Sequence, residues 1–255
     1  MPIVNGIWID EFADFGLVLE KNNTLEILSE FVSSHEGCSE LKIIPNLLWG
    51  QNIIYFTCFS TRFVALSAQG SPFAANAVER LYRTGVKRII GIGTAGSTNE
   101  DIKPGTFLLP TGAVRDEGTS RGYVDISVPA TPDIASLMVL KKTLELAGYL
   151  PILGNIYTTD QRYKEKPDLL KILNKRANVV GIDMETSSLL ITAAYHRIPI
   201  SVVKIVTDCA VKESEGDFQG VFDDPTVYSS WLNPKLEIAL TAALETCEKY
   251  KNGVL

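Results

Sequence analysis

Short apolar runs alternate with longer amphipathic stretches along most of the chain. The short runs are rich in β-branched residues, which is typical of buried strands. We predict strands at Ile53–Cys58, Phe63–Ala68, Lys87–Ile92, Thr106–Leu109, Ala113–Arg115, Ile152–Tyr157, Asn178–Val180 and Ile200–Val206. Between them, apolar residues recur with helical spacing. We predict helices from Pro72 to about Tyr82 with Gly85 as C-terminal cap, over Pro132–Ala147, from Met184 onward, and from about Asn233 to Tyr250.

This alternation predicts an α/β fold, in which a mixed, mainly parallel sheet is covered by helices on both faces as a three-layer sandwich. Neither an internal repeat nor a linker divides the sequence, so we expect residues 1–255 to form a single domain. In open α/β sheets, ligands bind at the carboxyl ends of the strands. Polar residues that directly follow a predicted strand are therefore the candidates for chemistry.

Composition narrows the classes of function. The net charge of −6 argues against a general nucleic-acid-binding protein. No apolar run reaches membrane-spanning length, and the first five residues lack the basic start of a signal peptide, so we expect no membrane partner.

The cysteines and histidines predict no metal site. The four cysteines are far apart and match no metal-binding or redox spacing, so we predict reduced thiols in a cytoplasmic protein. They are Cys38, Cys58, Cys209 and Cys247. The two histidines each lie among helical neighbours, which argues against a histidine-based metal centre.

The segment Gly181-Ile182-Asp183-Met184-Glu185-Thr186 places two carboxylates and a methionine between a predicted strand and a predicted helix. Carboxylates can accept hydrogen bonds from sugar hydroxyls, and a methionine offers an adaptable apolar surface beneath a sugar ring. Taken alone, the segment is more typical of a helix start, in which Asp183 caps the helix and Glu185 lies in its first turn.

Gly91–Ser97 is a second candidate, because it is rich in glycine and follows a predicted strand. In such a turn, backbone N–H groups can approach an anion or a polarised water closely. A tight strand–helix turn is the simpler interpretation. Neither a dinucleotide-binding fingerprint nor a Walker loop is present.

Two further segments follow predicted strands. In Thr158–Tyr163, an aromatic ring could stack on a planar base while Gln161 or Arg162 donates to its ring acceptors, and a solvated loop is the alternative. Asp208 follows an apolar strand, where burial can favour the neutral carboxyl and suit it to general-acid catalysis. An ordinary turn or helix cap is the commoner role of such an aspartate.

Together and in this order, these segments resemble the purine nucleoside and uridine phosphorylase superfamily, which also contains hydrolytic nucleosidases. The resemblance runs from about Ser67 to Phe218, well over half of the chain. It rests on Gly70-Ser71-Pro72, Glu79-Arg80-Leu81, Gly91–Gly96, Ala113–Asp116, Gly154–Tyr163, Gly181–Glu185 and Val206–Asp208.

The resemblance implies an enzyme that cleaves the N-glycosidic bond of a purine nucleoside or a related compound through a ribosyl cation-like transition state. It implies that Glu185 binds the ribose hydroxyls and stabilises the developing charge, and that Asp208 protonates purine N7. The remaining implied contacts are Met184 and Asp183 at the ribose, Tyr163, Arg162 and Gln161 at the base, and Gly93 and Thr94 on the phosphate or water side.

The departures from the family pattern concern phosphate. Phosphorolytic members hold phosphate with arginines, since a guanidinium fork matches its oxygens. One such arginine stands where this chain has Gly91, and the N-terminal Gly-Asp-Pro-x-Arg turn is missing. Arg62 or Arg115 could replace them if the fold brings either one near. The departures favour hydrolysis, without any cofactor, over phosphorolysis with inorganic phosphate as co-substrate.

Other interpretations stay open. The chain could be a phosphate-dependent purine nucleoside or uridine phosphorylase that releases ribose 1-phosphate, or a non-catalytic nucleoside-binding or storage protein on the same fold. A nicotinamide-dependent oxidoreductase rests on the glycine-rich turn alone. The resemblance also implies a homo-oligomer, a dimer or hexamer in which a neighbouring subunit completes each site.

Overall fold

The computed structural model describes residues 3–4, 7–8, 13–20, 24–44, 52–162, 166–211 and 225–253. Its strands are β1 (Ile3–Val4), β2 (Ile7–Trp8), β3 (Phe15–Leu19), β4 (Cys38–Ile44), β5 (Ile53–Cys58), β6 (Thr61–Ser67), β7 (Arg88–Ser97), β8 (Phe107–Asp116), β9 (Ile152–Thr159), β10 (Val179–Asp183) and β11 (Ile200–Cys209). Its helices are α1 (Thr24–Ser34), α2 (Ser71–Arg83), the short 3-10 helix η1 (Ser120–Gly122), α3 (Ile134–Leu146), α4 (Pro167–Ala177), α5 (Thr186–Tyr195) and α6 (Pro225–Lys251).

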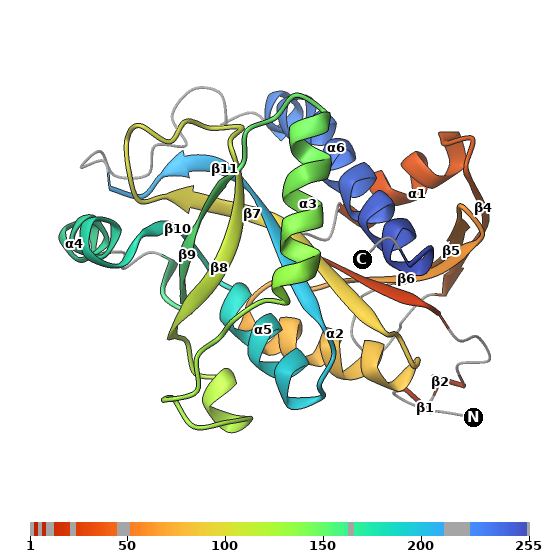
Figure 1. Cartoon of the computed structure of the whole chain (residues 1–255), viewed down its shortest axis with the longest axis horizontal. Helices are drawn as coiled ribbons and strands as arrows, with labels where there is room; N and C mark the ends of the chain where they lie inside the picture. Colours follow the sequence, from red (N-terminus) through yellow and green to blue (C-terminus); the bar gives the residue numbers. More distant parts are fainter. Residues whose placement is uncertain are drawn as a thin grey trace.

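Nine of the strands form one mixed sheet in the order β10-β9-β8-β11-β7-β3-β6-β5-β4 (Figure 1). The predicted mixed, mainly parallel sheet is confirmed: β3 runs parallel to β6 and β7, β11 to β7, and β9 to β8 and β10. β10 also pairs with β7, in antiparallel fashion, so this end of the sheet closes on itself. The closure brings the carboxyl ends of β7, β10 and β11 together.

Helices cover both faces of the sheet, as the three-layer prediction requires. One apolar core packs α1, α3 and α6 against the sheet, and a second packs α2 and α5 against the other face (Figure 1). Strand β3 shows how alternation divides them, because Leu17 and Leu19 belong to the first core and Val18 to the second. The next side chain on the Val18 face is Glu20.

The glycine-rich segment Gly91–Ser97 is not a turn, so that part of the prediction is wrong. Strand β7 continues through it to Ser97, paired with β11 on one side and with β10 near its end. Glycines in an extended strand leave room for neighbouring groups. At Gly93 the Glu20 side chain, which directly follows β3, fills that room. The glycines therefore mark a close approach within the sheet.

Other boundaries also differ from the predicted ones. The two short strands predicted around Pro110 are one strand, β8, with an irregularity between Pro110 and Gly112. β10 extends to Asp183, so α5 begins at Thr186 instead of Met184. The C-terminal helix starts earlier than predicted, and Pro234 lies inside it.

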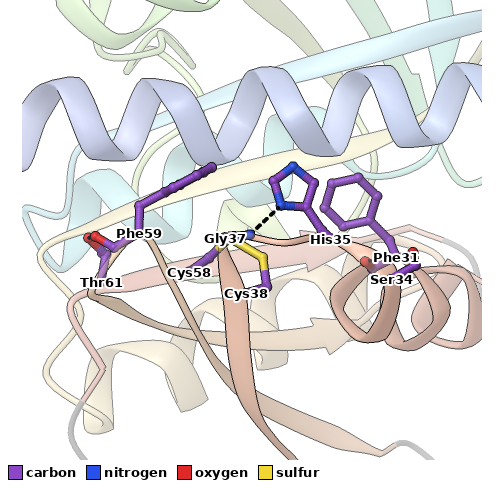
Figure 2. Close-up of a disulfide and its surroundings, with 8 residues drawn as sticks. All are labelled: Phe31, Ser34, His35, Gly37, Cys38, Cys58, Phe59 and Thr61. Carbon is purple, nitrogen blue, oxygen red and sulfur yellow. Dashed lines mark hydrogen bonds between the residues drawn. A yellow bond between two sulfur atoms is a disulfide. The ribbon is translucent and has the colours of Figure 1, made fainter.

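Cys38 and Cys58 form a disulfide, so the prediction of four reduced thiols is wrong for this pair (Figure 2). The two residues face each other across the antiparallel β4–β5 pair with their Cα atoms 4.0 Å apart. Strand register creates this proximity, and spacing along the sequence does not reveal it. Cys209 and Cys247 are free thiols. The predicted cytoplasmic location rested in part on reduced thiols, so the disulfide removes that argument and the location stays a prediction.

Helix α6 is 27 residues long and carries several charged residues. Within the described part of the chain, no helix combines the length and the apolar character needed to cross a membrane.

Candidate active site

The ends of β7, β10 and β11 bring together three of the predicted segments. Gly96 of β7 is paired with Ile182 of β10 on one side and with Asp208 of β11 on the other. The motif that ends β10 and the aspartate of β11 therefore flank the same strand. This places the predicted sugar-side and base-side groups at one edge of the sheet.

Glu185 is buried at the start of α5, where it is the N-cap residue. Its Oε1 accepts a hydrogen bond from the Gly70 N–H at 2.7 Å, and its Oε2 accepts one from the Met184 N–H at 3.3 Å. Burial raises the pKa of Glu185, while the nearby Lys204 ammonium opposes the rise. The carboxylate is thus held in one orientation by backbone groups from two segments distant in sequence.

Asp183 is also buried, and both of its oxygens bond to the protein. Oδ1 accepts a hydrogen bond from the Thr158 hydroxyl at 2.7 Å. Oδ2 accepts hydrogen bonds from the Thr186 N–H at 3.0 Å and from the Thr186 hydroxyl at 2.5 Å. Asp183 thus accepts a hydrogen bond from the first N–H of α5, as a capping side chain would, although the N-cap position itself belongs to Glu185 and Glu185 does not lie in the first turn.

Lys204 is the central charge of the site. It is fully buried in β11, its ammonium contacts the Glu20 carboxylate, and it lies 2.5 Å from Asp183 Oδ2 and 3.6 Å from Glu185 Oε2. Burial alone lowers the pKa of Lys204, but the surrounding carboxylates raise it above its ordinary value. The ammonium therefore stays protonated, and one positive charge is shared by three carboxyl groups.

Glu20 fills the space beside Gly93. It follows β3, and its backbone N–H donates to the Ile92 carbonyl at 3.0 Å. A Cβ at position 93 would lie 1.6 Å from Glu20 Oε2, so only glycine admits this carboxylate. Burial raises the pKa of Glu20 well above its ordinary value, and Lys204 opposes the rise. The side predicted to face phosphate or water is therefore occupied by a carboxyl group.

The base side is more open. Asp208 is half-buried, its Oδ1 accepts a hydrogen bond from the Thr207 hydroxyl at 2.6 Å, and its Oδ2 lies beside Gly96. Burial and the Asp208 charge raise the pKa of Tyr228 in α6 to about 12, while Arg162 opposes the rise. Three groups from separate segments thus interact electrostatically at this end of the site.

The other predicted contacts differ in exposure. Met184 directly follows β10, Thr94 lies within β7, and both are half-buried. Gln161 is exposed and lines a cavity of about 10 Å³ beside Ile182. Tyr163 lies outside the described residues.

Neither of the two arginines proposed as phosphate ligands faces Gly93. Arg62 lies 3.6 Å from Asp14 at the opposite end of β3. The Arg115 guanidinium donates to the Ser120 hydroxyl and to carbonyl oxygens of residues 120, 124, 125 and 128, so its donors are already used. Neither Arg62 nor Arg115 therefore replaces the phosphate-binding arginines of the family.

Among the residues that the structure describes, two groups of side chains have metal-ligand spacing. One contains Glu20, Asp183 and Glu185, whose carboxylate oxygens lie within 4.8 Å of one another. The Lys204 ammonium contacts all three and takes the position that a cation would need. The other group contains His35 and the two cysteines of the disulfide, whose sulfurs are bonded to each other (Figure 2).

Sequence reasoning missed Glu20, Lys204 and Tyr228. Glu20 follows the apolar run Phe15–Leu19, which is the same signal that singled out Asp208. Lys204 interrupts the apolar run of β11, and a lysine inside a buried strand requires acidic partners. Tyr228 belongs to a helix far along the chain, and no local pattern connects it with the site.

Comparison with known proteins agrees with this geometry. Residues 39–225 match the family model of the Phosphorylase superfamily. The chain belongs to this family. It is accordingly an N-glycosidic bond-cleaving enzyme, and the family binds nucleosides. The oxidoreductase alternative has no support from the family.

Relatives in the family carry several activities. A uridine phosphorylase of Treponema pallidum is 28% identical over 66% of this chain and 70% of its own length. A purine nucleoside phosphorylase of Plasmodium falciparum is 29% identical over 71% of this chain and 73% of its own length. A guanosine phosphorylase of Halorubrum lacusprofundi is 35% identical, but the match spans 49% of this chain and 51% of that protein.

Solved structures show the same fold. Uridine phosphorylase from Vibrio fischeri ES114 superposes with a TM-score of 0.78 at 23% identity, covering 94% of this chain and 93% of its own. AMP nucleosidase from Bacteroides thetaiotaomicron superposes with a TM-score of 0.71 at 21% identity, covering 94% and 91%. Phosphorylases and a nucleosidase thus share this architecture, and the fold by itself does not select between them.

Proposed function

We propose that the protein is a purine nucleosidase, which hydrolyses the N-glycosidic bond of a purine nucleoside or a related compound. The observation that carries hydrolysis is the carboxyl group of Glu20 beside Gly93, on the side from which the nucleophile approaches. A phosphate dianion placed there would face three carboxyl groups that share a single ammonium. Water is neutral and meets no such repulsion.

The sugar side supports stabilisation of a ribosyl cation. As the C1′–N bond lengthens, positive charge develops on the ribose ring, and a fixed carboxylate next to it lowers the barrier. Glu185 has the required fixed position, because its two oxygens accept hydrogen bonds from two backbone N–H groups. In this proposal Glu185 binds the ribose hydroxyls, Met184 packs against the sugar, and Asp183 positions the helix start and Lys204.

The base side supports protonation of the leaving group. Asp208 is half-buried and flanks the same strand as the sugar-side motif. In this proposal Asp208 gives a proton to purine N7 as the bond to C1′ breaks, and the base leaves with the bonding electron pair. Water adds its hydroxyl to C1′ and releases its remaining proton to solvent, and Asp208 regains a proton from solvent before the next turnover. Arg162, Gln161 and Tyr163 are proposed contacts of the base.

A second candidate is phosphorolysis. It is favoured by the names of several relatives, which are phosphorylases, and by the presence of a buried lysine near the nucleophile side. The structural similarity to AMP nucleosidase shows that the fold is compatible with either reaction. The non-catalytic binding protein has no support from the family, and both Glu185 and Asp208 are retained at the site.

The decisive experiment incubates the purified protein with purine and pyrimidine nucleosides, with and without inorganic phosphate. We expect base release from purine nucleosides at a rate independent of phosphate, with free ribose as the second product. Ribose 1-phosphate as the product would establish phosphorolysis instead. Binding detected by calorimetry without any base release would contradict both reactions. Sedimentation of the same preparation tests the proposed homo-oligomer.

A further inference from the structure

We propose that His35, Cys38 and Cys58 form a zinc site when the disulfide between the two cysteines is reduced. The site lies where α1 leads into β4 and where β5 turns into β6, at the end of the sheet opposite to β10 (Figure 1). It is independent of the proposed hydrolysis. Zinc is the metal that this donor set favours, because two thiolates balance its charge and thiolate and imidazole are its usual protein ligands.

The three side chains are already close together. The sulfurs of the two cysteines and a ring nitrogen of His35 lie within 4.8 Å of one another. The ligand atoms of a tetrahedral zinc ion lie about 3.5–3.8 Å apart, given zinc–sulfur bonds of about 2.3 Å and zinc–nitrogen bonds of about 2.0 Å. Small side-chain rotations therefore suffice to reach this geometry, once the two sulfurs are no longer bonded to each other. Water would be the fourth ligand.

The His35 ring has a lone pair on the side of the cysteines. Its Nδ1 accepts a hydrogen bond from the Gly37 N–H at 3.2 Å, and Figure 2 shows this edge of the ring turned toward the cysteine pair. A ring nitrogen that accepts a hydrogen bond carries no proton, which is also the condition for binding a metal. Zinc would replace this hydrogen bond, and the Gly37 N–H would then lie beside a thiolate that can accept it.

Two connected turns hold the ligands in place. The Cys38 N–H donates to the His35 carbonyl at 2.9 Å, and the Phe59 N–H donates to the Gly37 carbonyl at 2.9 Å. The His35 ring packs between Phe31 and Phe59, whose ring centroids lie 5.0 and 5.6 Å from its own (Figure 2). Aromatic neighbours of this kind limit the access of water to a metal site. The ligands are therefore positioned before a metal arrives.

The site depends on the redox state of the two cysteines. Reduction by a dithiol breaks the bond between the two cysteine sulfurs and gives each of them a proton, while the two sulfurs of the reductant join in a disulfide. Zinc then displaces these two protons as it bonds to the sulfurs. Cys38 and His35 are half-buried, so the reductant and the metal can both reach the pair. In the oxidised protein the thiolates are absent and no zinc site forms.

The test compares the oxidised protein with the same protein after reduction by a phosphine, which is removed before zinc is added. The free thiols Cys209 and Cys247 are present in both samples, so the oxidised protein is the control for them. We expect one zinc ion per chain in the reduced protein alone, measured by competition with a coloured chelator. Cobalt in place of zinc should give the near-ultraviolet absorption of a thiolate–cobalt bond. If the reduced protein binds no zinc, or the oxidised protein binds it equally well, the proposal is wrong.

Variants of the reduced protein identify the ligands. Cys38→Ser should lose the zinc and the cobalt absorption. His35→Gln should keep the thiolate absorption but bind zinc at least about tenfold more weakly, because loss of a group that only supports a metal ligand already costs about 10–100-fold in affinity. Cys209→Ser is the matched control, since it removes a thiol outside the site and should bind zinc like the wild type. Zinc binding as tight in Cys38→Ser or His35→Gln as in this control would contradict the assignment.

Discussion

The two sides of the candidate active site are built in different ways. On the side that we propose binds the sugar, Glu20, Asp183 and Glu185 are buried around the Lys204 ammonium. On the side that we propose binds the base, Asp208 is half-buried, Arg162 is exposed, and Asp208 has a threonine hydroxyl as its partner. The proposed sugar side is thus buried and internally paired, whereas the proposed base side is more open to solvent.

This difference has a chemical meaning. Charge that develops on a sugar ring is stabilised best by groups that need not rearrange during the reaction. A proton donor must instead reach an atom of the substrate and exchange its proton in each turnover. We therefore expect substitutions on the sugar side to affect folding and all substrates, and substitutions on the base side to affect only substrates whose leaving group needs a proton.

The largest effect is expected from Lys204→Met. Removal of the ammonium leaves three buried carboxyl groups without their cation, so we expect the free energy of unfolding to fall by about 3–5 kcal/mol in urea titrations. Lys249→Met is the control, because Lys249 is partly exposed and lies 3.7 Å from Glu245 on the same helix. It should cost less than about 1 kcal/mol. Equal losses in the two variants would show that the buried cluster is not a unit.

Asp208→Asn should reduce purine release without changing stability. The variant keeps the side-chain shape but cannot donate a carboxylic proton, so we expect kcat to fall about 10²–10⁴-fold on a purine nucleoside. A nitrophenyl riboside, whose leaving group needs no proton, should lose far less. Asp101→Asn, on an exposed loop, should have wild-type rates on both substrates. If Asp208→Asn lost the same factor in kcat on both substrates, Asp208 would not be the general acid.

Glu185→Gln should reduce both reactions together. The amide lacks the negative charge that stabilises the ribosyl cation, so we expect a fall of about 10²–10³-fold in kcat with purine nucleoside and nitrophenyl riboside alike. Glu237→Gln on the exposed face of α6 is the matched control. A loss confined to the purine nucleoside would place Glu185 on the base side and contradict the comparison.

The smallest effect concerns pH. Burial raises the pKa of Glu185, and catalysis in this account needs its ionised form. As pH falls through this raised pKa, kcat/KM for the nitrophenyl riboside should decline by about tenfold per pH unit, with a midpoint above the ordinary value of 4.5. Glu185→Gln should lose this acidic limb in the same rate measurements. If kcat/KM of the variant still declined at low pH as in the wild type, the decline would belong to another titrating group.

The sequence predicted the parts of the fold that depend on local pattern. The apolar runs at Ile53–Cys58 and Ile200–Val206 are strands because their side chains are buried, and alternation with helices was enough to predict the layers. Strand pairing depends on contacts between distant segments. For this reason the Cys38–Cys58 disulfide and the extension of β7 through Gly91–Ser97 were not predicted.

The candidate site also contains residues that local sequence predicted and residues that it did not. Glu185 and Asp208 each follow an apolar strand, and their convergence at Gly96 agrees with the prediction that ligands bind at strand ends. The ion pair of Glu20 and Lys204 joins residues 184 positions apart, which only the β3–β7–β11 arrangement brings into contact. Sequence could identify each as an unusual charge beside apolar neighbours, but not their pairing.

The central claim is that water attacks the sugar. It is tested most directly by running the wild-type reaction on a purine nucleoside in water labelled with heavy oxygen, with inorganic phosphate present in large excess over substrate. Mass spectrometry of the sugar product then identifies the nucleophile. The account predicts free ribose that carries the label on its first carbon, and an unlabelled ribose 1-phosphate would contradict it.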